Sequence, residues 1–250
     1  MDLGLTDKRV LVTGATRGIG RVTARIFAAE GARVAITYQS AAGRAAEVVE
    51  ELGGTGRSMA MPYELRDPAS ITAAVDEVER KWGGIDVLVA NAHWFTWVDP
   101  DTAPLFEDVP PAEWADLLRA NVDGQLLTVQ CALTGMRKRG WGRVVLLSSV
   151  TAHHGLPGSE IYSASRAAVQ GFARGLMWSR GGVLVNVVAP GGTRTESLER
   201  VDPAQLARAE RDTPSGRLST PEDVGNLIAF LCSEANGNIN GSIIHVAGGR

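Results

Sequence analysis

The sequence is poor in cysteine, in charge of one sign and in long hydrophobic runs. Its two cysteines, Cys131 and Cys232, lie in apolar helical segments without metal-ligand spacing, so we expect reduced packing residues and no metal site. The 28 acidic and 25 basic residues are interspersed and give a net charge of −3, which argues against nucleic acid or an anionic membrane as a partner. No apolar run approaches about 18 residues, and residues 1–8 lack the pattern of a leader. These absences predict a soluble, cytoplasmic protein whose partners are small molecules.

The chain is long and apolar enough to bury a large core. It has 250 residues, of which 44% are hydrophobic and 21% charged, and we expect a single α/β domain over residues 1–250. Short apolar runs alternate with helix-period segments, which predicts a doubly wound, Rossmann-type fold: a parallel sheet with helices on both faces, in three layers. The predicted strands cover 9–12, 33–37, 87–90, 144–147, 184–189 and 243–246. The predicted helices cover 20–30, 41–52, 68–82, 113–136, 162–178 and 221–233.

Two of the predicted loops, 93–110 and 191–214, are long for this architecture. Long loops over a rigid sheet usually cover a ligand site, so we expect the substrate to bind beneath them. The second loop is rich in charge, and it is interpreted either as a lid closing over a bound ligand or as a solvated charged helix, two readings that are compatible. Its charged residues include Arg194, Glu196, Glu199, Arg200 and Asp202.

Tyr162 and Arg166 are four positions apart in the predicted helix 162–178, so their side chains share one face. Ser149 stands 13 residues upstream of Tyr162, after an apolar run, where a strand would deliver it to the same place. A phenol with a pKa of about 10 exchanges protons near neutral pH only if a neighbouring positive charge favours the phenolate. A guanidinium stays charged at any accessible pH, so the pair predicts a proton-transfer site.

Residues 13–20 read Thr-Gly-Ala-Thr-Arg-Gly-Ile-Gly, and they follow a predicted strand and open a predicted helix. Glycines in this context permit a tight turn and a close approach of the backbone to a pyrophosphate, while the helix N-terminus supplies partial positive charge. We therefore expect a dinucleotide to bind here, in preference to a turn without a ligand.

The second predicted strand ends in Thr37-Tyr38-Gln39-Ser40, without the acidic residue that would bind a free ribose 2′-hydroxyl. Arg17 adds positive charge within the glycine turn. This combination favours NADP(H) over NAD(H), unless Arg17 is only a solvated surface charge.

Together with Ser149, Tyr162 and the string Asn-Val-Val-Ala-Pro-Gly at 186–191, the glycine turn resembles the classical short-chain dehydrogenase/reductase family, in particular its ketoacyl reductases. The motifs occur in the family's order over essentially the whole chain. The resemblance places four catalytic positions at Asn121, Ser149, Tyr162 and Arg166. It implies that Tyr162 donates a proton to a carbonyl oxygen as a nicotinamide delivers hydride, while Ser149 polarises the same oxygen and Asn121 orders the helix and local water.

The resemblance also implies a set of cofactor-binding residues that runs along the chain. Glu64-Leu65 stands where the family usually has Asp-Val beside the adenine, which we interpret as a tolerated variation. The set comprises Gly14, Thr16, Arg17, Gly18, Ile19, Gly20, Gln39, Ser40, Glu64, Leu65, Asn91, Ala92, Tyr162, Arg166, Pro190, Gly191, Thr193 and Thr195.

Arg166 departs from the family, which has lysine at this position. An arginine supplies the charge and can bind the nicotinamide ribose, but it does not deprotonate and so does not readily continue a proton relay. Halohydrin dehalogenases, relatives with the same fold, use a Ser-Tyr-Arg set without a nucleotide and replace the glycine turn by a bulky segment. This chain keeps the turn at 13–20 and, at 190–195, a match to the family's nicotinamide-contacting Pro-Gly-x-x-x-Thr. We therefore favour a ketoreductase over a dehalogenase-like enzyme, lyase or cyclase, with a nucleotide-binding regulator as a third hypothesis.

The substrate side departs from the family as well. The family has Asn-Ala-Gly after the fourth strand, whereas this chain has Asn-Ala-His at 91–93, followed by Trp94, Phe95 and Trp97. We expect His93, Trp94 and Trp97 to wall a pocket for a bulky, aromatic or polyketide-like ketone; the alternative is that the segment packs against a neighbouring helix. His154 is a further substrate candidate or a surface residue.

Members of the family usually form tetramers through two long central helices, here 113–136 and 162–178. We accordingly expect a homotetramer or a homodimer.

Overall fold

A seven-stranded parallel sheet forms the centre of the protein, with strand order β3-β2-β1-β4-β5-β6-β7. This computed structural model describes residues 1–95, 98, 102–178 and 180–250. The chain winds outward in both directions from β1 and β4, so the predicted doubly wound fold class is confirmed. The strands are β1 (Arg9–Val12), β2 (Arg33–Tyr38), β3 (Ser58–Pro62), β4 (Val87–Ala90), β5 (Gly142–Leu147), β6 (Val183–Pro190) and β7 (Ile243–Val246).

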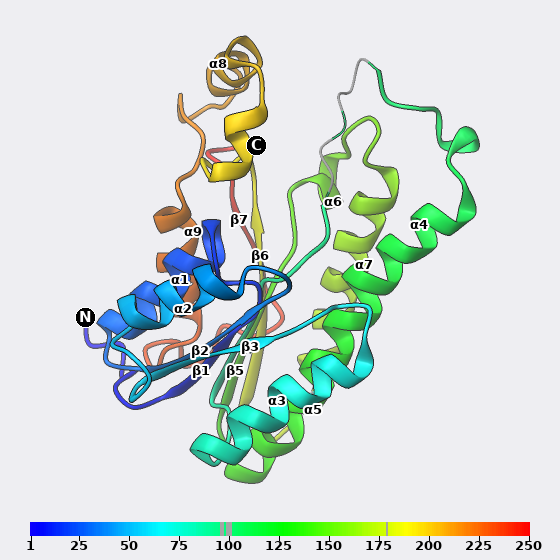
Figure 1. The fold of residues 1–250 in the computed structure, drawn as a ribbon. Coiled ribbons are helices and arrows are strands. Elements are labelled where there is room, and N and C mark those ends of the chain that lie inside the picture. The colour runs from blue at the N-terminus through cyan, green and yellow to red at the C-terminus, as the bar shows by residue number, and fades with distance from the viewer. Residues whose placement is uncertain (96–97, 99–101, 179) are drawn as a thin grey trace.

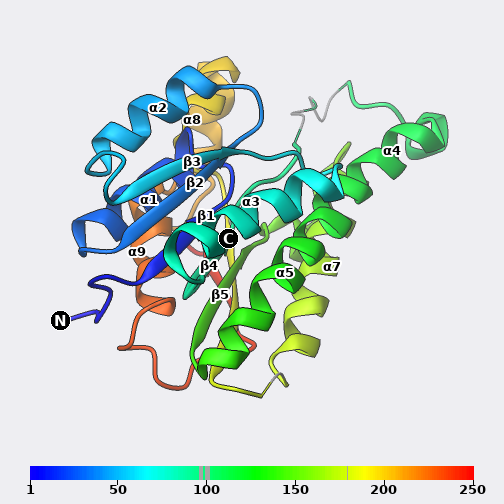
Figure 2. The same ribbon diagram turned by 60° about the horizontal axis from the view of Figure 1, so that its bottom comes forward.

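Helices cover both faces of the sheet, giving three layers (Figures 1 and 2). One face is covered by α1 (Gly18–Ala29), α2 (Ala42–Glu51) and α9 (Pro221–Leu231), and the other by α3 (Pro68–Trp82), α5 (Gly124–Arg139) and α7 (Glu160–Leu176). Successive residues of the strands point to opposite faces. In β5, Val144 and Leu146 join the core beneath α3, α5 and α7, whereas Val145 and Leu147 join the core beneath α1, α2 and α9.

Strand β3 was absent from the prediction. Its sequence, Ser-Met-Ala-Met-Pro, contains no β-branched or aromatic residue, so local propensity does not favour a strand. Pairing with β2, from Val34 opposite Ser58 to Tyr38 opposite Pro62, imposes the extended conformation. Tertiary context therefore decides this element.

The predicted helix 113–136 is wrong in its continuity. The chain forms α4 (Pro111–Leu118), then one π-helical turn, η2 (Arg119–Asp123), and then α5. Such π turns often occur at functional sites, and this one contains Asn121. The other five predicted helices agree with the structure to within two residues at each end.

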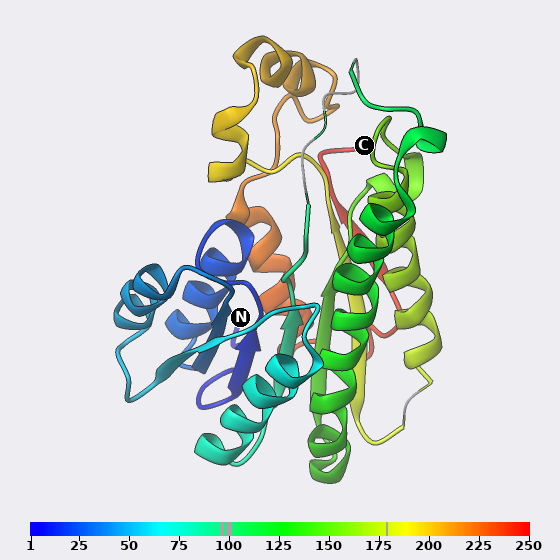
Figure 3. The same ribbon diagram turned by 45° about the vertical axis from the view of Figure 1, so that its right-hand side comes forward.

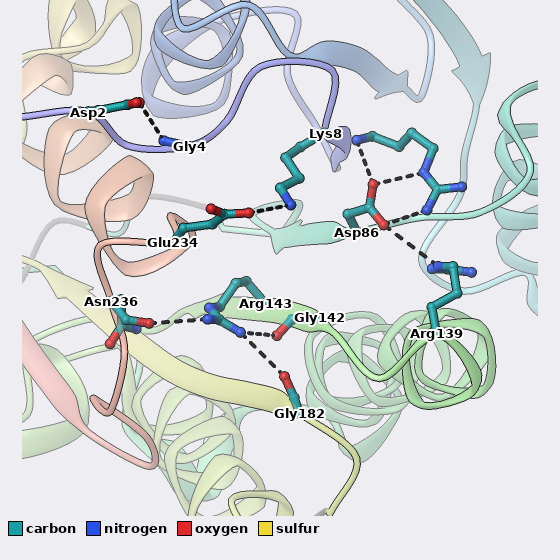
Figure 4. A network of polar contacts seen from close by, with 11 residues as sticks. Asp2, Gly4, Lys8, Asp86, Arg139, Gly142, Arg143, Gly182, Glu234 and Asn236 are labelled. Carbon is teal, nitrogen blue, oxygen red and sulfur yellow. Dashed lines mark hydrogen bonds and ion pairs between the residues drawn. The ribbon is translucent and has the colours of Figure 1, made fainter.

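Ion pairs hold the amino ends of the central strands (Figure 4). Arg9 at the start of β1 donates to the carboxylate of Asp86 from Nε at 2.8 Å and from Nη2 at 2.5 Å, and Nε of Arg139 lies 3.6 Å from the same carboxylate. Lys8 pairs with Glu234 at 2.7 Å. Burial opposes ionisation of Asp86, but the hydrogen bonds and charge of Arg9 lower its pKa below the ordinary value. Ion pairs therefore hold this end of the sheet together.

Arg143 is buried at the start of β5, among main-chain oxygens (Figure 4). Its Nη1 donates to Gly142 O at 3.0 Å and to Gly182 O at 3.3 Å, and its Nη2 donates to Asn236 O at 3.1 Å. The guanidinium also lies over the Trp141 ring, 4.5 Å from the ring centroid. Arg143 thus joins β5 to the segments that precede β6 and β7.

The two long loops both lie at the opposite, carboxyl end of the sheet (Figures 1 and 3). Loop 93–110 contains a 3-10 turn, η1 (Phe106–Asp108). Loop 191–214 contains a second such turn, η3 (Glu196–Arg200), and a helix, α8 (Pro203–Arg211). Loop 191–214 was interpreted either as a lid or as a solvated charged helix, and the structure shows that it includes a helix. Within the described ranges, no helix has the length and apolar character needed to cross a membrane.

Candidate active site

A cavity of about 820 Å³ opens at the carboxyl ends of the strands, between the two long loops. It brings together residues that are far apart in the sequence, as expected for ligand sites in open α/β sheets. Nearly all of the predicted site residues line it: Gly14, Thr16, Arg17, Gly18, Ile19, Gly20, Gln39, Ser40, Glu64, Leu65, Asn91, Ala92, His93, Trp94, Ser149, Tyr162, Pro190, Gly191, Thr193 and Thr195. Arg166 and Asn121 lie behind this wall, both fully buried.

The glycine turn leaves no room for side chains. A Cβ on Gly14 would lie 3.0 Å from Ala92 Cα, and a Cβ on Gly20 would lie 2.6 Å from Gly14 O. Gly14 also has a φ of 64°, which L-residues rarely adopt. Asn91 fixes the turn by donating from Nδ2 to Thr13 O at 2.9 Å and to Gly14 O at 3.0 Å. The backbone at the start of α1 is therefore bare and held in place, as close contact with a ligand requires.

An acidic side chain faces the N-terminus of α1. Gly18 N donates to Glu196 Oε2 at 3.1 Å, which brings a carboxylate from η3 to the positive end of the helix. A pyrophosphate would seek the same place for the same reason. Glu196 and such a ligand would therefore compete for Gly18 N.

Ser149 follows β5 and is oriented by a neighbour in α6 (Thr151–His154). Thr151 donates to Ser149 Oγ twice, from its main-chain N at 3.2 Å and from Oγ1 at 3.0 Å. A serine hydroxyl has two acceptor positions and one proton. With both acceptor positions taken, Ser149 is left to donate its own proton, and its hydroxyl lowers the pKa of the neighbouring Tyr162.

Arg166 lies beside Tyr162, as their spacing predicted. Its Cζ is 5.2 Å from the centroid of the Tyr162 ring, and its Nη1 donates to Leu147 O at 3.0 Å. The Nε and Nη2 groups are buried and have no hydrogen-bond partner among the described residues. Burial lowers the pKa of Arg166 from its ordinary value. A buried guanidinium with unused donors is costly unless a ligand accepts from it.

The pKa of Tyr162 differs in direction from the expectation. Burial raises it, and the charge of Arg166 and the hydrogen bond with Ser149 lower it, but the net pKa is above the ordinary value of 10.0. The charge of Arg166 therefore acts as predicted but does not outweigh burial in the protein without a ligand. The phenol is protonated at neutral pH, the state needed to give a proton to a carbonyl.

Asn121 makes contacts that the sequence analysis did not foresee. Its Nδ2 donates to Trp94 O at 2.7 Å, and its Oδ1 accepts from Trp94 N at 2.7 Å. The expected role for Asn121 was to order its helix and local water. In the structure, the side chain holds the main chain where loop 93–110 leaves the sheet.

The aromatic side chains that follow β4 pack against two different residues, Tyr162 and Arg66. The ring of Phe95 packs against that of Tyr162, with centroids 4.7 Å apart, and His93 approaches the same ring at 6.3 Å. Trp94 lies beneath the guanidinium of Arg66, whose Cζ is 4.6 Å from the ring centroid. Phe95, which was counted only as part of an aromatic run, is therefore the closer neighbour of Tyr162.

The structure describes three of the four substrate candidates, and one of these, His154, does not line the cavity. Trp97 falls outside the described residues. His154 is exposed, and its Nδ1 lies 2.9 Å from Gly155 O in its own turn. The described residues form no cluster of three or more His, Cys, Asp or Glu that could hold a metal ion.

Two arginines that the sequence analysis did not single out, Arg44 and Arg66, line the cavity near Gln39. Arg44 and Arg17 are exposed, and neither forms an ion pair within the described part of the chain. Arg66 pairs with Glu64 at 3.2 Å, and Gln39 donates to the same carboxylate at 2.5 Å. Although burial opposes it, these hydrogen bonds lower the pKa of Glu64. A cation shortly after the second strand was the signal that could have identified Arg44.

A family model described as Enoyl-(Acyl carrier protein) reductase matches residues 14–250. The chain is 36% identical over 253 residues to the 3-oxoacyl-(acyl-carrier-protein) reductase FabG of Aquifex aeolicus (strain VF5), covering 100% of this chain and 99% of that protein. It is 34% identical over 250 residues to the reductase of the same name from Escherichia coli (strain K12), with coverages of 99% and 98%.

Solved structures agree with this result over the whole chain. A short chain dehydrogenase/reductase family protein superposes with a TM-score of 0.86 and 31% identity, covering 100% of this chain and 98% of that one. Levodione reductase superposes with a TM-score of 0.88 and 28% identity, with coverages of 98% and 97%.

Proposed function

The chain belongs to the classical short-chain dehydrogenase/reductase family, and from that premise we propose that it is an NADP(H)-dependent ketoreductase. The observation that carries the proposal is the pairing of two features in one cavity. At one end, the glycine turn lines the cavity as a cradle of bare backbone, packed so closely that a Cβ at Gly14 would meet Ala92 and a Cβ at Gly20 would meet Gly14 O. At the other end, Arg166 keeps Nε and Nη2 buried without partners, next to Tyr162. Both features fit a dinucleotide: the cradle suits its pyrophosphate, and the free donors suit its nicotinamide ribose.

In this proposal the site's own residues position a carbonyl group and move one proton. The cofactor, when bound, supplies a hydride. Ser149, with its acceptor positions filled by Thr151, donates a hydrogen bond to the carbonyl oxygen. Tyr162 gives the same oxygen its phenolic proton, and Arg166 stabilises the phenolate that remains. Asn121 holds Trp94 and hence the wall of the pocket.

The preference for NADP(H) is supported by the charges around the adenosine end of the cavity. Arg17 and Arg44 line the cavity and are free to pair with a 2′-phosphate. Glu64, the nearest acidic residue of the predicted set, is engaged by Arg66 and Gln39. The negative charge that would repel a phosphate is therefore compensated.

The substrate side supports a bulky ketone of aromatic or polyketide type. His93, Trp94 and Phe95 replace the small wall that a glycine would leave, and two of their rings contact Tyr162. Aromatic walls bind flat apolar groups. The relatives named above act, by their names, on 3-oxoacyl groups and on levodione, so a 3-oxoacyl thioester, a cyclic diketone and an aryl ketone form the first test panel.

Titration with NADPH and NADH tests the cofactor assignment directly. We expect NADPH to bind at least tenfold more tightly than NADH, and the double change of Arg17 and Arg44 to glutamine to remove about 10-fold to 100-fold of NADPH affinity while leaving NADH binding unchanged. Absence of binding would reject the reductase. Tight binding without turnover on the panel would favour a nucleotide-binding regulator instead.

A dehalogenase-like or lyase activity is the competing enzyme class, because halohydrin dehalogenases also use a Ser-Tyr-Arg set. Arg166→Lys separates two interpretations of this residue. If the guanidinium substitutes imperfectly for lysine, the variant will reduce ketones faster than the wild-type protein. If the site has been rebuilt around a guanidinium, the variant will lose activity.

We also propose a homotetramer or homodimer that assembles through α5 and α7, in a reducing cytoplasm that suits the two free cysteines. Light scattering on the purified protein, coupled to size-exclusion chromatography, measures the assembly.

A further inference from the structure

The tautomer of His93 can be assigned from its contacts. Its Nδ1 lies 3.0 Å from Asn91 O, and a carbonyl oxygen can only accept a hydrogen bond, so Nδ1 carries the hydrogen. His93 is exposed on its open side, but desolvation by the surrounding cavity wall and the charges of Arg166 and Arg17 lower its pKa to about 4. The ring is therefore neutral near pH 7, and Nε2 keeps a free lone pair.

The free nitrogen faces the ligand side of the cavity. Nδ1 is turned back to the main chain, so Nε2 is the outer corner of the ring. His93 lines the cavity, and its ring centroid is 6.3 Å from that of Tyr162. No described residue donates a hydrogen bond to Nε2. An acceptor thus stands unused beside the proton donor of the site.

The neighbours of His93 restrict what can bind to it. Arg166 is close enough to lower the pKa of His93, and its positive charge disfavours a cationic donor. The same guanidinium offers Nε and Nη2 as unused donors. A hydroxyl group satisfies both demands, because it can accept from a guanidinium and donate to an imidazole.

We propose that Nε2 of His93 accepts a hydrogen bond from a ligand hydroxyl placed beside the reacting carbonyl. The proposal rests on the reductase function proposed above and adds a chemical class to it: hydroxyketones. The same hydroxyl chemistry is also present on the nicotinamide ribose, so the source is either the substrate or the cofactor. A family glycine at this position offers no side chain, so the contact is specific to this chain.

A matched pair of ketones tests the substrate as the source. Acetophenone and 2-hydroxyacetophenone differ by one hydroxyl next to the carbonyl, and a site built to bind that hydroxyl discriminates strongly against the ketone without it. We expect kcat/KM with NADPH to favour the hydroxyketone by about 10-fold to 100-fold in the wild-type protein. His93→Phe keeps a planar ring without nitrogen and should bring the ratio near one. His93→Gln keeps a neutral acceptor and should retain part of the ratio.

Titration of the same variants with NADPH, followed by cofactor fluorescence, tests the ribose as the source. If the ribose donates the hydroxyl, His93→Phe should weaken NADPH binding about tenfold, with the ketone ratio unchanged. Thermal unfolding of each variant checks that it folds.

The results separate this proposal from the function on which it rests. A wild-type protein that reduces both ketones, with neither the ratio nor the NADPH affinity altered in His93→Phe, would overturn the role of His93 and leave the reductase intact. A wild-type protein that does not bind NADPH would overturn both.

Discussion

Two arginines are buried at opposite ends of β5, and they are used differently. At the amino end, Arg143 donates three hydrogen bonds from its two terminal nitrogens to the carbonyl oxygens of Gly142, Gly182 and Asn236, and only its Nε has no partner among the described residues (Figure 4). At the carboxyl end, Arg166 is fully buried but donates only to Leu147 O, and its Nε and Nη2 have no partner among the described residues. Each guanidinium stacks near one aromatic ring, so packing does not distinguish them.

The difference shows how a site can be recognised within a well-packed core. A buried charge stabilises a fold when neighbouring groups accept its hydrogen bonds, as those around Arg143 do. A buried charge that keeps its donors free has a cost in stability, and function is the usual reason for such a cost. The unused donors of Arg166 therefore indicate the candidate ligand site more clearly than its burial does.

The largest expected effect comes from Arg166→Met, which removes the charge but keeps an unbranched side chain. Reduction of a ketone should slow about 10³-fold, or roughly 4 kcal/mol in the barrier, because the phenolate of Tyr162 loses its counter-charge. The unfolding free energy should change by less than about 1.5 kcal/mol, since few hydrogen bonds are lost. Steady-state kinetics and denaturant unfolding measure the two quantities.

Removing the charge of Arg166 should also raise the pKa of Tyr162 further, because that charge lowers it. Absorbance titration against Tyr162→Phe isolates this phenol. If Arg166→Met reduced ketones at the wild-type rate, Arg166 would have no functional role to distinguish it from Arg143.

Arg143→Met should have the opposite outcome. Three carbonyl oxygens would each lose a donor, and we expect a loss of about 3 kcal/mol in the unfolding free energy. Turnover per folded molecule should stay within about twofold of the wild-type value, because Arg143 lies at the other end of the strand. A large loss of turnover in folded Arg143→Met would show that the two ends are not independent.

A smaller effect is expected from Thr151→Val, which keeps the shape of the side chain but removes one of the two donors to Ser149 Oγ. Ser149 Oγ would then keep only the main-chain donor of residue 151 and be oriented less firmly, and kcat should fall about tenfold with NADPH affinity unchanged. Thr151→Ser, which keeps the hydroxyl, should restore kcat. Equal loss in both variants would point to packing in place of hydrogen bonding.

The smallest effect is expected from Glu196→Gln. Its carboxylate accepts from Gly18 N at the place we assign to the pyrophosphate, so removing the negative charge should tighten NADPH binding about threefold. The gain should shrink at high salt, because this side chain is exposed. Glu107→Gln, an exposed acid of the other long loop, is the matched control and should bind NADPH as the wild type does.

Most of the fold could be predicted because the sequence pattern and the tertiary structure agree. Apolar strand runs and helix-period segments located all the strands except β3, whose Ser-Met-Ala-Met-Pro sequence gives no local signal. The π turn at Asn121 could not be predicted from the sequence either, because one extra residue in a helix turn leaves the apolar pattern almost unchanged.

The candidate site was predictable where motifs and spacing determine it. The four-residue spacing of Tyr162 and Arg166 implies their contact, and the glycine turn implies the cradle. The contact of Phe95 with Tyr162 depends on the path of a loop, which no periodicity specifies. The net pKa of Tyr162 depends on how deeply the ring is buried, and sequence spacing does not report that depth.

The clamp between Asn121 and Trp94 has a consequence for engineering this protein. One amide satisfies both main-chain groups of Trp94, much as a neighbouring strand would, and so gives loop 93–110 a fixed starting point. Residues beyond that point can be exchanged for segments from relatives while the root of the loop stays in register with the sheet. Asn121 thus provides a boundary for grafting, where new substrate loops can be joined to an unchanged candidate active site.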